Sequence, residues 1–384
     1  MNEIFKIADN VQLDEITLQN YITNHKQQVS EYFKPLYDAY ENKYAFFDNQ
    51  KSDETESDKP DNCLAVNFAK YITDVMNHFF IGIPMKMSSS DNEVNQYLEE
   101  LETYNNQNQN NVELSKMTSI FGRGYEMYST DENNKICIAN CSPLQAFMIY
   151  EDSLLSRPKY FVRYYTDMNH IDKGIVCDTE SIRYFSITDA GLSFDTEAVT
   201  HGFNGVPAVE YRENDERQGI FETVLPLINE YNKILSEKAE DAEYFADTYL
   251  KISGVKSDDE EIKNIRSNRI INIEGDNGEK AVVEFLERPD SDSGREELLN
   301  RLERLIFTIS MVPDMSDVIE TESKYKLFPM CSLFKAKEKC FTDGIHNRYQ
   351  LIFSNSVSGM EDKSCTTIQS VFTPCYPGAT GEGV

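Results

Sequence analysis

The chain has 384 residues, enough for two or three domains with a sizeable core, and 40% of them are hydrophobic. Its formal net charge of −29 argues against a protein that binds nucleic acid by neutralising phosphates, because such binding needs patches of lysine and arginine. This charge does not exclude a protein that surrounds DNA without holding it.

The sequence gives no sign of a membrane segment or a disulfide framework. The chain has no run of 18 apolar residues, which a membrane-spanning helix would need. Its first 15 residues lack the basic and apolar regions of a secretory signal. Eight cysteines are scattered without a C-x-x-C pair, which indicates reduced thiols in a cytosolic setting. We therefore expect no membrane partner.

Helical patterns and polar gaps alternate at the start of the chain. Residues 14–46 carry apolar and aromatic side chains at helical spacing, so they are predicted to form a helical arm. Residues 48–61 are polar and charged, and they are predicted to be a mobile loop. The next helix is expected to be capped by Asn62 or Asn67 and to end at residues 82–84, where a glycine and a proline occur.

The pattern then changes from helix to strand. A helix is expected near residues 92–103, and the polar tract from Asn105 to Asn111 is predicted to be a loop. Residues 112–127 are again predicted to be helical. From Lys135 to Tyr211 apolar and polar residues alternate between turn residues, which predicts an antiparallel β domain.

The longest helical pattern runs from Phe221 to Gly254. Apolar residues recur along it at helical spacing, and its other face is rich in glutamate and aspartate. Glu240, Glu243 and Asp247 are three and four residues apart, so they share one face of a helix. An ordinary amphipathic helix with a solvated face fits this segment taken alone.

A short insert separates this helix from a second one. Residues 255–292 contain two predicted strands on either side of Gly275–Gly278, a sequence typical of a hairpin turn. A capping box from Ser293 to Glu296 opens the second helix, predicted for residues 295–312. A third helix is predicted from about Ser323 to Phe353, and a tail rich in glycine and proline comes after it.

Sequence motifs of common enzymes are missing. The chain has no phosphate-binding G-x-x-x-x-G-K-[ST] loop, no H-E-x-x-H and no G-x-S-x-G. Its five histidines lie in unrelated segments, and no pair of carboxylates stands in an apolar setting typical of acid–base catalysis. We therefore expect no catalytic residue, no metal and no cofactor.

Seven collinear motifs cover most of residues 60–353, and they match those of one known family. They are NFAKYITDVMNHFFIGIPMKM at 67–87, FGRGYEMYSTDENN at 121–134, SPLQAFMIYED at 142–152, KYFVRYY at 159–165, HGFNGVPAVEYREND at 201–215, GIFETVLPLINEYNKILSEKAEDAEYFADTYLKISG at 219–254 and LLNRLERLIFTISMVPDMSD at 298–317. With this series the chain resembles the portal proteins, or head-to-tail connectors, of tailed bacteriophages, of the type found in siphophages of Gram-positive bacteria.

The resemblance implies an α+β, portal-type fold with long stem helices, an α/β clip insert, and a wing of helices and antiparallel strands. The implied parts are an N-terminal helical arm and mobile loop (1–59), the wing (60–220), the first stem helix (221–254), the clip (255–292), the second stem helix (293–313), a shortened tunnel loop (314–323), and the wing's spine helix with a truncated C-terminal tail (324–384).

The resemblance also implies a role without enzymatic activity. Such proteins form a homo-oligomeric ring, usually a dodecamer, at one vertex of the virion capsid, and double-stranded DNA is packaged and ejected through it. The implied partners are the large subunit of terminase, the head-completion or adaptor protein, and the major capsid and scaffolding proteins. The implied locations are the portal vertex and, during assembly, the host cytoplasm.

This interpretation singles out two groups of candidate residues. Glu240, Glu243 and Asp247 are the candidate lining of the DNA channel, because an acidic lining repels a duplex evenly and lets it slide. The candidates for docking the motor and the adaptor lie in the clip: Arg269, Asp276, Asn277 and Lys280.

Other interpretations stay open at this point. The first is a non-viral scaffold or interaction protein whose acidic helices bind a basic partner. A degenerate prophage copy of a portal protein is the second, since the tunnel loop is short and relatives continue into a crown after the tail. A hydrolase with an unrecognised site is the third.

Overall fold

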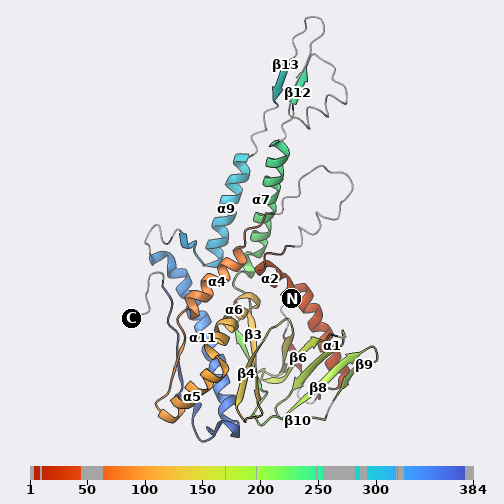
Figure 1. The fold of residues 1–384 in the computed structure, drawn as a ribbon, viewed down its shortest axis with the longest axis vertical. Helices are drawn as coiled ribbons and strands as arrows, with labels where there is room; N and C mark the ends of the chain where they lie inside the picture. Colours follow the sequence, from red (N-terminus) through yellow and green to blue (C-terminus); the bar gives the residue numbers. More distant parts are fainter. Residues whose placement is uncertain are drawn as a thin grey trace. The chain divides into compact units, whose positions relative to one another are not determined.

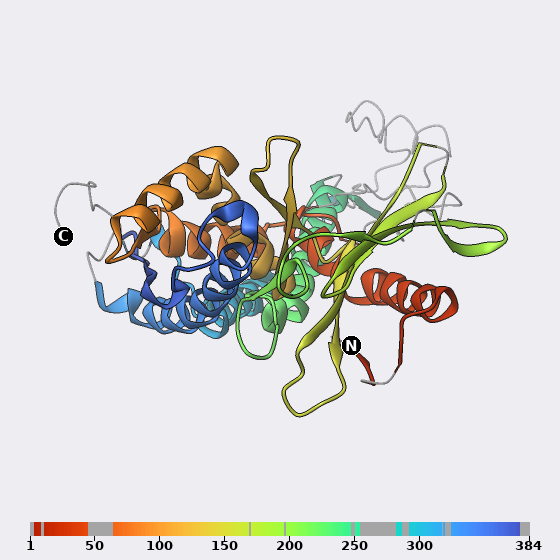
Figure 2. The same cartoon turned by 90° about the horizontal axis from the view of Figure 1, so that it is seen from below.

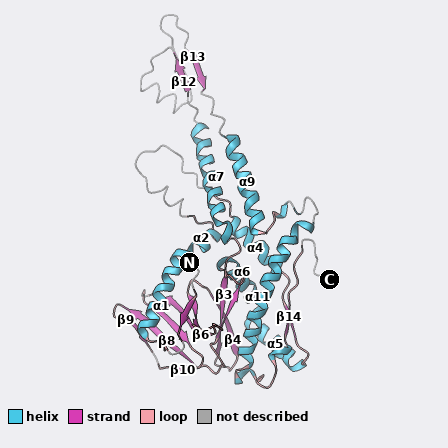
Figure 3. Cartoon of the chain, turned by 180° about the vertical axis from the view of Figure 1, so that it is seen from behind, coloured by secondary structure: helices cyan, strands magenta, loops and turns pink. Residues whose placement is uncertain are grey.

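The computed structural model describes residues 4–8, 11–44, 64–168, 170–195, 197–246, 250–253, 282–285, 292–316, 318 and 324–376. The chain divides into two units. The first comprises Met1–Lys43, Asn67–Leu225 and Phe307–Val384, and the second comprises Tyr44–Val66 and Pro226–Ile306. Both helices and sheets are present (Figures 1 and 3), which confirms a mixed α and β class.

The N-terminal arm is helical, as predicted. It consists of α1 (Glu15–Gln28), a π-helical turn (Val29–Phe33) and α2 (Lys34–Tyr40). Asp14 caps α1, because its Oδ1 accepts a hydrogen bond from the backbone N–H of Thr17 at 2.8 Å. The preceding strand β1 (Phe5–Ile7) was not predicted, since three residues are too few to show a period.

A large sheet in the first unit has the strand order β1-β5-β6-β7-β8-β10, and β9 also pairs with β8. Its pairs are antiparallel, as predicted, except that β1 runs parallel to β5. The further strands are β5 (Ala146–Glu151), β6 (Pro158–Thr166), β7 (Asp172–Cys177), β8 (Ser181–Thr188), β9 (Gly191–Phe194) and β10 (Val199–Thr200).

Both faces of this sheet are covered. Helix α1 packs on one face, where Leu18 and Ile22 meet a cluster that includes Phe147 (Figure 2). On the other face, Met148 and Phe161 belong to a cluster shared with a second sheet. Strand β5 is therefore buried on both sides and consists almost entirely of apolar residues.

The second sheet has the order β11-β3-β4, with β3 at Arg123–Thr130, β4 at Ile136–Cys141 and β11 at Ala208–Arg212. The prediction of helix for residues 112–127 was wrong for its last part. Helix α6 ends at Phe121, because Gly122 adopts a left-handed conformation with φ 77°. A Cβ at this position would lie 2.0 Å from the carbonyl oxygen of Arg217, so the turn requires glycine.

The prediction of a loop from Asn105 to Asn111 was also wrong. Helix α5 (Asn92–Asn105) and helix α6 (Gln107–Phe121) meet at a single residue, Asn106, which has φ 49°. The amide of Asn105 pairs with the outer edge of β4, accepting from Ile138 N at 2.8 Å and donating to Ile136 O at 3.0 Å. The Asn105 side chain thus satisfies two backbone groups at a strand edge, which accounts for one of the polar residues in this helical tract.

The remaining elements of the first unit surround helix α11 (Phe328–Phe353), which confirms the third predicted helix. Helix α4 (Phe68–Ile81) is capped by Asn67, the second of the two predicted caps, whose side chain accepts from Lys70 N at 3.0 Å. Strands β2 (Lys86–Ser88) and β14 (Gln369–Val371) form an antiparallel pair. Short 3-10 turns occupy Glu222–Val224, Lys324–Leu327, Ser356–Ser358 and Cys365–Thr367.

Two buried ion pairs join α11 to the centre of the unit. Arg348 binds the carboxylate of Glu126 in β3 through two nitrogens, at 2.9 and 2.7 Å. Gln107 and Asn111 of α6 complete this group, at 3.0 Å from Glu126 Oε1 and 2.8 Å from Arg348, respectively. Nearer the start of α11, Lys337 Nζ lies 2.7 Å from Glu213. Each charge is therefore paired inside the protein, as burial requires.

Replacing Arg348 with methionine should strongly destabilise the first unit, because it leaves the Glu126 carboxylate buried without its counter-charge. We expect a loss of about 3–5 kcal/mol in the free energy of unfolding, measured by urea denaturation. Lys363→Met is the control, since Lys363 pairs with Asp91 and Glu93 at the surface, where solvent screens the pair, and its loss should change the free energy of unfolding far less. Equal losses in the two variants would contradict the central role of the buried pair.

The buried imidazole of His25 should make stability depend on pH. Its Nδ1 lies 2.8 Å from the hydroxyl of Tyr164. Burial, together with the charge of Arg123, lowers its pKa from 6.5 to about 3. Below pH 6.5 the imidazole is protonated in the unfolded chain, whereas in the folded chain it stays neutral down to about pH 3. The folded state therefore loses stability as the pH falls through this window, by about 2 kcal/mol at pH 5.

Urea unfolding of wild type and His25→Gln at pH 7, 6 and 5 checks this expectation. The variant should lose less stability on acidification than wild type, whereas His346→Gln, at an exposed histidine, should follow wild type. Parallel pH profiles for wild type and His25→Gln would show that the buried imidazole is not the source of the effect.

Candidate functional site

The candidate site is built on the two long helices of the second unit, α7 (Leu225–Ala246) and α9 (Asp292–Ser310). They lie side by side (Figures 1 and 3) and share a core of Ile234, Leu299 and Leu302. Leu227, Tyr231 and Leu235 pack around this core. Lys238 of α7 forms an ion pair with Glu296 of α9, so contacts between the helices include both apolar and charged groups.

Helix α7 is shorter than the sequence predicts. The first stem helix was expected to span residues 221–254, but α7 ends at Ala246, and Leu250–Ser253 forms strand β12. This strand pairs antiparallel with β13 (Val282–Phe285), with Leu250 opposite Phe285 and Ser253 opposite Val282. Strand β12 thus lies just before the predicted insert of residues 255–292 and pairs with β13 inside it. The predicted strand and hairpin turn near Arg269–Gly278 lie outside the described residues.

A second side of α7 binds the extended segment at residues 64–66. Asn232 accepts a hydrogen bond from Val66 N at 2.8 Å and donates one to Val66 O at 3.3 Å. Ser236 does the same with Leu64, accepting at 3.1 Å and donating at 2.8 Å. Four helical residues rise about 6 Å and two extended residues span about 6.6 Å, so the two spacings match. We call this segment the strap.

The third side of α7 is partly exposed and mostly acidic. Asn229, Glu230 and Lys233 are exposed, and Glu237 and Glu240 are half-buried. These residues recur at intervals of three, four and seven, so they continue along one side of the helix. The sequence therefore indicated an acidic face, although the face includes Glu230 and Glu237, which were not among the candidate channel residues.

The structure places only part of the predicted site. Glu240 lies on α7, half-buried, and it takes part in an interaction with the rest of the protein. Glu243 belongs to the same helix. Asp247 lies outside the described residues, as do the four candidate docking residues of the insert: Arg269, Asp276, Asn277 and Lys280. Their proposed roles stay predictions.

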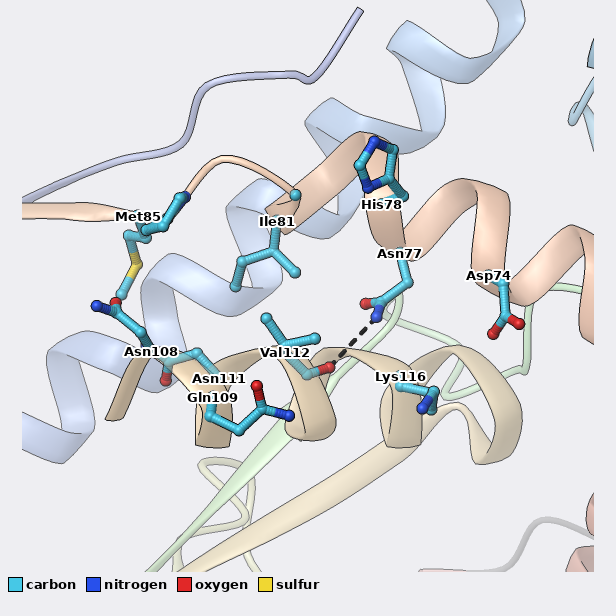
Figure 4. A pocket seen from close by; sticks show the side chains of 12 residues that line it. Asp74, Asn77, His78, Ile81, Met85, Asn108, Gln109, Asn111, Val112 and Lys116 are labelled. Atoms are coloured by element: carbon cyan, nitrogen blue, oxygen red, sulfur yellow. Dashed lines mark hydrogen bonds between the residues drawn. The ribbon is translucent and has the colours of Figure 1, made fainter. Parts of the chain in front are cut away.

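A pocket of about 450 Å³ lies in the first unit between α4 and α6 (Figure 4). Asn77 points into the space between the helices, where its Nδ2 donates to Val112 O at 3.4 Å, and its buried Oδ1 has no hydrogen-bond partner among the described residues. At the rim, Asp74 is paired with Lys70 and Lys116 with Glu113. The charged groups of the pocket are thus already engaged within their own helices.

The described residues hold no arrangement typical of catalysis. The nearest approach is His78, whose Nε2 lies 3.4 Å from Cys375 Sγ, but within the described part of the chain no hydrogen bond orients its other nitrogen. Buried carboxylates do occur, at Glu126, Glu210 and Glu213, and each faces an arginine or a lysine. In those parts that the structure describes, no cluster of three metal-binding side chains occurs.

The described helices include none that combines the length and the apolar character needed to cross a membrane.

A comparison with protein families matches residues 18–382 to the family described as phage portal protein, SPP1 Gp6-like. The chain belongs to this family of phage portal proteins. A search of curated proteins finds no match. The family match shows a phage portal function, that of a head-tail connector in DNA packaging, and the family is structural rather than catalytic.

Replacing Asn232 with alanine should loosen the strap of this portal protein, because Val66 N–H and C=O would both lose their partner on α7. We expect faster hydrogen exchange at the Val66 amide and a loss of about 1–3 kcal/mol in the stability of the second unit, measured by urea unfolding.

Asn229→Ala is the matched control, since Asn229 lies on the same helix but is exposed. If both variants left the exchange of Val66 at the wild-type rate, the side-chain clamp would not be what holds the strap.

Proposed function

We propose that this portal protein forms a closed ring at one vertex of the capsid and that double-stranded DNA passes through its centre. The family match over residues 18–382 carries the proposal. The packed pair of long helices, α7 and α9, supports it, because it fits the two stem helices that such a ring requires. In this interpretation the first unit contains the wing, and α11 is its spine.

The proposed mechanism uses electrostatic repulsion instead of binding. Duplex DNA carries about one charge per 1.7 Å of its axis, so a basic channel would hold it with steep salt dependence. The acidic side of α7 carries Glu230, Glu237 and Glu240 against a single cation, Lys233, among the described residues of that side. Repeated around a ring, this surface would repel the duplex from every direction and let it slide.

The partners are proposed on the same basis. The insert between α7 and α9, the proposed clip, docks the large subunit of terminase during packaging and the head-completion protein afterwards. Its two-stranded ladder of β12 and β13 supports a separate small module at this place in the chain. Contacts with the major capsid and scaffolding proteins belong to the wing, and assembly of the ring takes place in the host cytoplasm.

Reversing the charge of the proposed channel face tests the mechanism. The triple variant Glu240→Lys, Glu243→Lys and Asp247→Lys changes the charge by six units per subunit. Cations that face a duplex release its counterions and bind it, so we expect rings that retain DNA at low salt, with slower packaging and ejection. Negative-stain microscopy checks the rings, and packaging and ejection rates at low and high salt check the passage of DNA.

A control with the same charge change separates the channel from a general effect. Glu132, Glu180 and Glu361 are exposed in the first unit, and reversing these three to lysine should leave both rates near wild type. If packaging and ejection were as fast in the α7 triple variant as in this control, α7 would not line the channel, and the portal role would be unaffected. A wild-type chain that stays monomeric at every concentration would instead contradict the ring.

A further inference from the structure

The chain leaves α9 through a strained and tightly held turn. Met311, the first residue after the helix, has φ 60°, a conformation that residues other than glycine rarely adopt. Val312 comes next and is fully buried. Such a conformation persists only where the surroundings fix it from several sides. The turn lies in the first unit, so its neighbours within that unit show what fixes it.

The hydroxyl of Tyr71, in the first half of α4, bridges the two sides of this turn. It accepts a hydrogen bond from the backbone N–H of Met315 at 2.8 Å and donates one to the carbonyl oxygen of Pro313 at 3.4 Å. Burial raises the pKa of Tyr71, so the hydroxyl keeps the proton that it donates. One side chain therefore satisfies a donor and an acceptor two residues apart.

The ring of Tyr71 is fixed as well. It packs edge-on against Phe307 near the end of α9, with centroids 5.7 Å apart, and Phe68 packs against the same Phe307 ring at 5.7 Å. The hydroxyl is thus held in place by the same helix end whose exit it bridges. A tyrosine at this position does two things: the ring locates the end of α9, and the hydroxyl directs the chain beyond it.

Beyond the exit from α9 lies a short helical turn that starts at Met315. Asp314 caps it, accepting hydrogen bonds from Ser316 N at 2.9 Å and from Ser316 Oγ at 2.6 Å. Val318 N donates to Asp314 O at 3.3 Å and continues the turn. The direction of this turn is set at its first N–H, which is the group that Tyr71 holds.

We propose that Tyr71 is the positioning residue for the exit from α9: its hydroxyl holds Pro313 and Met315 in place, and this fixes the start of the segment that is expected to face the DNA. The proposal rests on the proposed function and on the expectation, from the family resemblance, that residues 314–323 form the tunnel loop of the ring. The proposal requires the hydroxyl group of Tyr71 and not only its apolar ring. Phenylalanine would keep the packing on Phe307, but it would release the loop.

Tyr71→Phe tests the proposal, with Tyr40→Phe as the matched control. The Tyr40 hydroxyl also bonds to α4, through Asp74 and Lys70, but it does not reach the exit turn. We expect the Met315 amide to exchange about fivefold faster in Tyr71→Phe and at the wild-type rate in Tyr40→Phe. In a packaging reaction with terminase and capsids, Tyr71→Phe should lower by at least half the share of heads that retain full-length DNA.

A second variant guards against misfolding of the first. Met315→Pro removes the donor N–H at the first position of a helical turn, where proline is well tolerated, and it leaves Tyr71 in place. It should cause the same loss of retained DNA, and the double variant should lose no more than either single one, because both remove the same hydrogen bond.

The outcomes separate this proposal from the proposed function. Wild-type exchange at Met315 in Tyr71→Phe would overturn the positioning role. Faster exchange with normal DNA retention would show that the contact is only structural, and it would overturn the proposal as well. Failure of the wild-type ring to package DNA would contradict the proposed function and with it the link to DNA, whereas the exchange rates would still decide whether Tyr71 holds the turn.

Discussion

The burial of charge at the centre of the first unit is the constraint on which its other contacts depend. Three carboxylates, Glu126, Glu210 and Glu213, lie on or directly after the strands β3 and β11, and their partners are Arg348, Arg217 and Lys337. A buried charge without a partner costs several kcal/mol, about as much as a domain can lose and remain folded. The small sheet and α11 therefore depend on each other for the pairing of their buried charges, so we expect them to fold cooperatively.

The same constraint explains the composition of the segments around it. Glu126 and Arg348 do not satisfy each other completely. Gln107 and Asn111 of α6 add further hydrogen bonds, and the Tyr128 hydroxyl donates one to Glu126. Burial lowers the pKa of Lys337, and the Glu213 carboxylate offsets this in part, with Ser115 O and Ser119 Oγ accepting the remaining protons of the ammonium group. A helix that faces such a core must be polar on its buried side.

This reversal of the usual pattern limited what the sequence could reveal. Periodicity located α1, α4, α9 and α11, because apolar residues recur at helical spacing along them, although Lys337 and Arg348 are also buried on α11. It failed for residues 105–111, where Gln107 and Asn111 are polar but buried, and where Asn111 finds its partner Arg348 more than 200 residues away. For the candidate site, the acidic face of α7 was predictable from spacing, but the end of the helix was not, since Leu250–Ser253 suits helix and strand alike.

The clamp on α7 has a consequence for how this chain can vary. Asn232 and Ser236 recognise only the backbone of the strap, so the side chains of Leu64 and Val66 are free of that contact. Substitution there leaves all four hydrogen bonds possible, with proline as the exception because it lacks the donor N–H. Related chains can therefore diverge freely at residues 64 and 66 while conserving a small polar residue at each of the two helix positions, a pattern opposite to that of an apolar interface.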